Sequence, residues 1–207
     1  MSWLKEQMAR LREFLRGDFR RVLTGCVFGM LGAVLLGVGI GILFPAQAAQ
    51  VLADFMAQIA DSGVISEEGE MSVFALLMNN WRAMLVSAAY GFIPFIFLPL
   101  ISLVINGGML GMLAVLFQAE GGSLAAYFAG ILPHGIFELP ALIFSIACGV
   151  ALCGNMCRLV TSSPRRIPMA ELLEDLLRVI VLVVAPLTVA AAFIECYVTP
   201  VVMGFFM

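Results

Sequence analysis

Residues 22–44 form an apolar run without a charged side chain, and this run constrains the fold more than any other feature of the chain. A helix rises about 1.5 Å per residue, so the run is long enough to cross a hydrocarbon core of about 30 Å. The whole chain is 62% hydrophobic and only 12% charged, whereas soluble proteins are roughly 25% charged. Together these features predict a polytopic membrane protein.

Two of the remaining apolar segments are too long for one straight span. Residues 73–119 are interrupted near their middle by Pro94 and Pro99, which predicts a helical hairpin with a tight turn. Residues 124–157 contain Pro133 and Pro140. Proline is well tolerated at a first helical position, so we expect a short outer piece to about 131, a helix that begins at Pro133, and a bend at Pro140.

The predicted fold class is therefore all-α, with five transmembrane helices and short interfacial amphipathic helices. No long polar linker divides the apolar part, so one membrane domain is expected over residues 22–207. The five predicted spans are about 22–44, 73–93, 97–118, 133–157 and 179–200.

Three polar segments predict interfacial helices. Residues 1–21 carry six Lys or Arg side chains and apolar residues at helical spacing, which indicates a basic amphipathic helix on the cytoplasmic membrane surface or against a protein partner. Residues 45–72 carry five acidic side chains and no Lys or Arg, and are predicted to form a short helix followed by an acidic loop. Residues 172–177 contain four leucines of a further short helix.

The distribution of Lys and Arg predicts the orientation. Basic residues mark cytoplasmic loops, and they occur in residues 1–21 and again in residues 158–178. Four crossings from a cytoplasmic N-terminus also return the chain to the cytoplasm at residue 158. We therefore expect a cytoplasmic N-terminus, an external acidic loop and an external C-terminus.

Other residue types suggest packing and partners. Gly25 and Gly29, like Gly37 and Gly41, are four residues apart, and such small residues allow helices to approach closely. A homodimer is therefore an expected partner arrangement, besides membrane lipids. The five cysteines form no Cys-x-x-Cys pair and are interpreted as small buried hydrophobic residues. No basic face or motif suggests nucleic-acid binding.

Ionisable and amide side chains inside predicted spans are costly, so each is a functional candidate. Glu138 lies 20 positions before Arg158, and Glu195 lies 17 positions after Arg178. At about 1.5 Å per residue, both glutamates fall in the outer part of the membrane. Most of the candidates are predicted to lie at this level, and Asn106 is predicted to lie deepest. The candidates are Asn79, Asn80, Arg82, Asn106, His134, Glu138 and Glu195.

Three interpretations of His134 and Glu138 remain open. As residues i and i+4 they share one helix face, and Glu138 could simply pair with His134 or Arg82. His134, Glu138 and Glu195 could instead bind zinc or another divalent ion. Catalysis or proton relay is the third interpretation, although no nucleophile motif accompanies the histidine.

A second compact feature is Asn106-Gly107-Gly108-x-x-Gly111. Here Asn106 could make a polar tie between helices. The glycines Gly107 and Gly111 would allow a tight crossing with a neighbouring helix.

Several motifs occur in a fixed order from about residue 70 to residue 200. They are Asn79-Asn80, Asn106-Gly107 with Gly111, Pro133-His134-Gly135-x-x-Glu138-Leu139-Pro140, and the closing Ile194-Glu195-x-x-x-Thr199-Pro200. In these motifs the chain resembles the stage II sporulation protein M family of bacterial and archaeal membrane proteins. The resemblance implies a location in the cytoplasmic membrane. Its motif residues here are Asn79, Asn80, Asn106, Gly107, His134, Glu138 and Glu195.

The resemblance also implies a role. The family's namesake works with a cell-wall hydrolase and a partner protein in septal wall thinning and engulfment. We therefore expect a non-enzymatic membrane scaffold of the cell envelope, with no cofactor. The alternatives are a transporter or permease with an ion or solute site in the outer half of the membrane, and an intramembrane metalloenzyme with a divalent metal at His134, Glu138 and Glu195.

Overall fold

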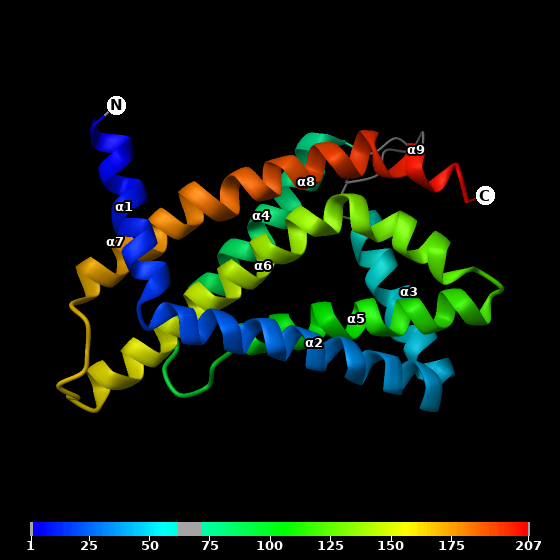
Figure 1. Cartoon of the computed structure of the whole chain (residues 1–207). Coiled ribbons are helices and arrows are strands. Elements are labelled where there is room, and N and C mark those ends of the chain that lie inside the picture. The colour runs from blue at the N-terminus through cyan, green and yellow to red at the C-terminus, as the bar shows by residue number, and fades with distance from the viewer. Residues whose placement is uncertain (1, 62–71, 207) are drawn as a thin grey trace.

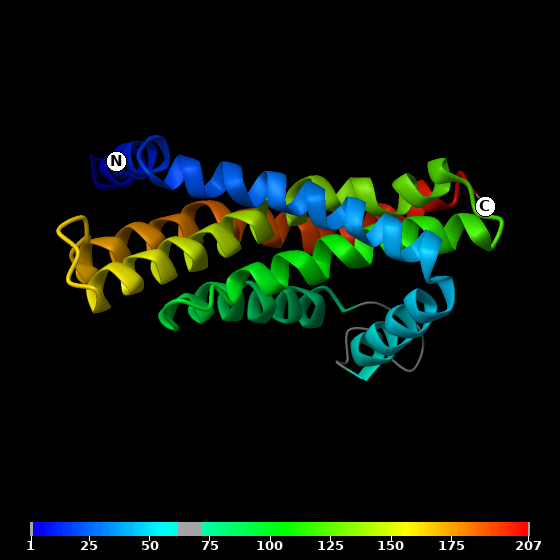
Figure 2. The same ribbon diagram turned by 90° about the horizontal axis from the view of Figure 1, so that it is seen from below.

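The computed structural model describes residues 2–61 and 72–206, and within these two ranges it contains helices and turns but no β-strand. Helix accounts for 86% of the structure. The long helices run between two ends of an elongated bundle (Figures 1 and 2). Helix α1 and the turn at 161–168 lie at one end, here called the N-terminal end, and the C-terminus lies at the other, the C-terminal end. The all-α prediction is confirmed.

The helices follow one another with short connections. In chain order they are α1 (Ser2–Arg16), α2 (Phe19–Leu43), α3 (Pro45–Asp61), α4 (Val73–Ala89), the 3-10 turn η1 (Tyr90–Phe92), α5 (Pro99–Ala119), α6 (Leu124–Val160), α7 (Met169–Val179), the π-helical turn η2 (Ile180–Val184), α8 (Ala185–Tyr197) and α9 (Thr199–Met203). The predicted helix after residue 45 is thus present as α3. The acidic loop that was predicted to follow it lies mostly outside the described residues.

Four of the five predicted spans are helices long and apolar enough to cross a membrane. They are α2, α5, α6 and the continuous stretch Met169–Tyr197 that joins α7 to α8. The predicted span 73–93 is shorter, because α4 has only 17 residues before the 3-10 turn, whereas about 20 are needed for a typical bilayer. The predicted hairpin itself is present, since α4 and α5 run in opposite directions (Figure 2).

Helix α6 corrects the prediction that a helix begins at Pro133. It begins at Leu124, where the Ser123 hydroxyl accepts a hydrogen bond from the amide of Ala126 at 3.1 Å, and it continues through both Pro133 and Pro140. A proline inside a helix removes one backbone hydrogen bond and bends the helix without necessarily ending it. Figure 1 shows α6 changing direction in its first half.

The last span also differs from its prediction. The short helix expected over 172–177 and the span expected over 179–200 form one continuous helical stretch. Its middle is the wide π-helical turn Ile180–Val184, which comes directly before Pro186. Proline cannot donate a backbone hydrogen bond, and a local widening of the helix accommodates such an interruption.

Helices α2 and α5 cross closely at glycines. A Cβ atom at Gly37 would collide with the backbone of Gly108, and one at Gly111 with the backbone of Val34 and Val38. The tight crossing predicted from the Asn-Gly-Gly motif is therefore confirmed. Part of the glycine-rich surface of α2 therefore packs against α5 of the same chain.

Asn106, in contrast, makes no hydrogen bond to another helix among the described residues. Its amide nitrogen donates to the carbonyl oxygen of Ser102 on α5 itself, at 2.8 Å. The polar tie between α4 and α5 is made by Ser87 and Ser102, whose hydroxyls lie 2.9 Å apart. The prediction that Asn106 ties helices is therefore not met, since its side chain bonds one turn back along its own helix.

The turn between α4 and α5 is held by cysteines of α6. The amide of Phe95 donates to Cys157 Sγ at 3.1 Å, and Cys153 Sγ donates to the carbonyl oxygen of Ile93 at 3.2 Å. Phe95 and Phe97 have φ values of 69° and 51°, an uncommon backbone for residues other than glycine. These two cysteines therefore do more than fill space, because they satisfy polar backbone groups of a strained turn.

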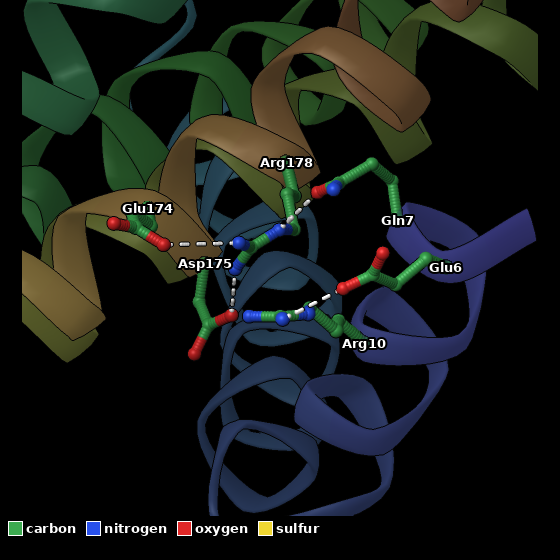
Figure 3. A network of polar contacts seen from close by, with 6 residues as sticks. All are labelled: Glu6, Gln7, Arg10, Glu174, Asp175 and Arg178. Atoms are coloured by element: carbon green, nitrogen blue, oxygen red, sulfur yellow. Dashed lines mark hydrogen bonds and ion pairs between the residues drawn. The ribbon is translucent and has the colours of Figure 1, made fainter. Parts of the chain in front are cut away.

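Helix α1 is docked on α7 by a polar network around Arg178 (Figure 3). The guanidinium of Arg178 donates to Gln7 at 2.7 Å, to Asp175 at 2.6 Å and to Glu174 at 3.0 Å. In addition, Leu11 of α1 belongs to the same buried core as Leu172 and Leu176 of α7. The amphipathic N-terminal helix that was predicted thus packs partly on the protein.

Candidate functional site

Three of the predicted site residues converge between α6 and α8. His134 and Glu138 belong to α6, Glu195 belongs to α8, and one ligand atom of each lies within 4.8 Å of the other two. We refer to His134, Glu138 and Glu195 as the His-Glu-Glu cluster. All three side chains are only partly exposed.

The local packing explains why these side chains meet. His134 and Glu138 are four residues apart on one face of α6. On α8, Thr188, Ala191 and Ala192 are fully buried and lie on the face that also carries Glu195. Since alanine side chains are small, α8 can pack closely against the neighbouring helices there, and Glu195 on this face lies close to Glu138.

The histidine is held from two sides. Its Nδ1 atom lies 3.1 Å from Thr199 Oγ1 at the start of α9, and its Nε2 atom lies 3.9 Å from a carboxylate oxygen of Glu138. The side chain of His134 is 14% exposed and that of Glu138 is 29% exposed. The contact with Thr199 links α6 to α9 and directs the second ring nitrogen toward the carboxylates.

Other predicted residues do not join the cluster. Arg82 is exposed and forms no ion pair with any residue in the described ranges. Of the two partners predicted for Glu138, His134 is found and Arg82 is not. Asn79 is partly buried on α4, and Asn106 and Gly107 belong to α5 as described above.

Asn80 lies on the face of α4 that is turned toward α8 and α6. One turn before it, Leu76 packs with Ala192, and one turn after it, Met84 contacts Thr188. The Asn80 amide nitrogen is buried and has no hydrogen-bond partner within the described part of the chain. Buried polar atoms usually have a partner, so this nitrogen is a donor available to a water molecule or ligand.

Two residues with structural roles were not predicted as candidates: Thr199, which contacts His134, and Arg178, which contacts α1. Thr199 belongs to the closing motif of the chain. A single hydroxyl side chain does not indicate which residue it will contact, and His134 is 65 positions away in the sequence. In the sequence, Arg178 served to predict the orientation of the chain and the depth of Glu195, but not as a residue that holds helices together. Its salt bridges to Asp175 and Glu174 follow helical spacing, so spacing could have indicated those two pairs, but not the contact with Gln7.

The fold and the cluster define a polytopic α-helical membrane protein with a His-Glu-Glu cluster between its last two long helices. The family to which it corresponds is stage II sporulation protein M, whose model matches residues 22–200. This match takes in the membrane bundle from α2 to α8, and the chain belongs to that family.

One relative is similar to this chain over part of its length. An uncharacterized protein of Methanocaldococcus jannaschii is 31% identical over 126 residues, which cover 61% of this chain and 70% of the relative. No solved structure matches the chain significantly.

Proposed function

We propose that this protein is a non-enzymatic assembly protein of the cytoplasmic membrane that organises partners at the cell envelope. The observation that carries the proposal is the family match across residues 22–200, because the family is named for a stage of sporulation and its namesake acts with partner proteins. The apolar outer faces of the helices offer surfaces for such partners or for a second copy of the chain. On α2, the side chains of Phe28 and Leu35 are 68% and 71% exposed.

The proposed orientation places the N-terminal end of the bundle in the cytoplasm. Helix α1 and the turn at 161–168 lie together at this end (Figure 1), and both carry arginines, which favour the cytoplasmic side. Reporter fusions test this orientation. A reporter that is active only in the cytoplasm should work after Ser163 and fail after Gly121. The opposite pattern would reverse the assignment.

Position-specific photo-crosslinking in cells tests the assembly role. A photoreactive residue at Phe28 or Leu35 should form reproducible adducts with defined envelope proteins or with a second copy of this chain. The same residue at Ala33, which is 3% exposed, is the matched control and should form none. If the exposed positions yield lipid adducts alone, the α2 face does not serve in assembly.

A permease is the second candidate, and the His-Glu-Glu cluster is the observation that favours it. Ionisable groups inside membrane segments often mark ion or substrate pathways. Purified protein in sealed vesicles distinguishes the two functions. Assembly proteins leave divalent-ion uptake equal to that of protein-free vesicles, whereas a permease raises uptake and loses it on Glu195→Gln.

A further inference from the structure

We propose that His134, Glu138 and Glu195 form a binding site for one divalent transition-metal ion of the zinc type. The proposal concerns the chemistry of the cluster and does not depend on the assembly role. It requires that the donor atoms, their charges and their surroundings all suit such an ion.

The donor set fits a metal of this class. An imidazole nitrogen with two carboxylates matches the ligands used by zinc, and also by manganese and ferrous iron. Ligand atoms about 2.0–2.1 Å from a tetrahedral zinc ion lie roughly 3.4 Å from one another. The His134 Nε2 to Glu138 Oε2 distance is 3.9 Å, and the ligand atoms of all three side chains lie within 4.8 Å of one another. Rotations of these side chains would therefore have to bring the ligand atoms closer together to surround an ion.

Charge balance favours a dication over a bare cluster. Two carboxylates close together in an apolar environment repel each other unless positive charge compensates them. Arg82, the arginine predicted as a partner of Glu138, is exposed and forms no ion pair within the described ranges. A divalent ion neutralises Glu138 and Glu195 together and leaves the histidine neutral, which is the form that binds metals.

The contact with Thr199 supplies the outer support that such a site needs. Metal-binding histidines usually donate a hydrogen bond from the ring nitrogen that does not face the metal. Here Nδ1 can donate to Thr199 Oγ1 at 3.1 Å, which leaves the lone pair of Nε2 directed toward Glu138. The threonine would thus fix the tautomer and the orientation of the ring, as a positioning residue.

Bound in this way, the ion joins α6 directly to α8 near the C-terminal end of the bundle. Zinc commonly takes four ligands, and sites with three protein ligands keep one position for water or another group. The proposed site therefore clamps two helices and retains an open position that a water molecule or a group of a partner protein can occupy.

The first experiment measures metal binding by the wild-type chain in detergent after removal of any affinity tag. His134 is the chain's only histidine, so imidazole ligation seen by X-ray absorption must come from this residue. We expect one zinc ion per chain after metal removal and reloading, an imidazole signal, the visible absorption of four- or five-coordinate Co²⁺ on cobalt substitution, and a higher melting temperature with zinc than with magnesium.

Matched variants locate the site. Glu195→Gln keeps the size of the side chain and should reduce zinc affinity at least tenfold, while Glu120→Gln changes an exposed glutamate and should leave affinity unchanged. Thr199→Val removes only the partner of Nδ1 and should weaken binding by about 10- to 100-fold. Equal affinity in wild-type and Glu195→Gln protein would overturn the proposal.

The wild-type measurements test whether the metal site exists even if a variant fails to fold. A chain that retains no stoichiometric zinc, shows no imidazole ligation and melts at the same temperature with and without zinc has no such site. In that case the cluster is neutralised by protons alone, and His134 only pairs with its neighbours.

Discussion

Replacing Arg178 by methionine should lower the free energy of unfolding by about 2–4 kcal/mol and release α1 from α7. The side chain of Arg178 is 14% exposed and that of its partner Asp175 is 20% exposed. Removing one member of a largely buried pair leaves the other charge without compensation, which costs more than the pair itself contributes. The variant also loses the charge-assisted hydrogen bond to Gln7.

The neighbouring pair Arg10–Glu6 offers a matched control within the same network (Figure 3). Both of its side chains are about half exposed, and exposed ion pairs contribute only about 0–1 kcal/mol. Arg10→Met should therefore change stability little. Equilibrium unfolding in mixed detergent measures the difference, and proteolysis near Gly17 reports the release of α1. Equal effects of the two substitutions would show that the Arg178 contacts do not hold α1.

Gly37→Ala should destabilise the bundle by about 1–3 kcal/mol because it overpacks the crossing of α2 and α5. The added Cβ atom would meet the backbone of Gly108, and backbone cannot move aside as a flexible side chain can. Restoring space would require the two helices to separate along a tightly packed stretch.

Gly39→Ala is the control for this prediction. It lies on the same helix, and a Cβ atom there has no neighbour within 4 Å. Both substitutions change helix propensity equally, so the difference in melting temperature between them reports packing alone. A Gly37→Ala protein as stable as Gly39→Ala would mean that α2 and α5 do not pack as closely as described.

The membrane helices could be predicted well from the sequence because apolar length is a local property. The run 22–44 appears as α2 (Phe19–Leu43), and the hairpin around Pro94 and Pro99 is present. The proline effects were harder to predict. Pro133 and Pro140 both suggested a boundary or a bend, yet whether a proline ends a helix or only bends it depends on the helices packed around it.

The candidate site, too, could be predicted from the sequence only in part. The i, i+4 spacing placed His134 and Glu138 on one helix face, and counting residues from the nearest arginines placed Glu195 at their level. Counting along a helix gives depth but not the direction in which a side chain points. It therefore could not distinguish Glu195, which joins the cluster, from Arg82, which is exposed.

By itself the sequence determined that this chain is an all-α membrane protein, where its main apolar segments lie and which residues are polar within them, because these properties depend on hydrophobicity and spacing along a single helix. Only the tertiary structure decided that His134 meets Glu195 and Thr199, that Arg178 holds α1, and that Gly37 lies against Gly108. Each of these contacts depends on the rotation of one helix about its axis relative to another, which follows from the packing of all their side chains together.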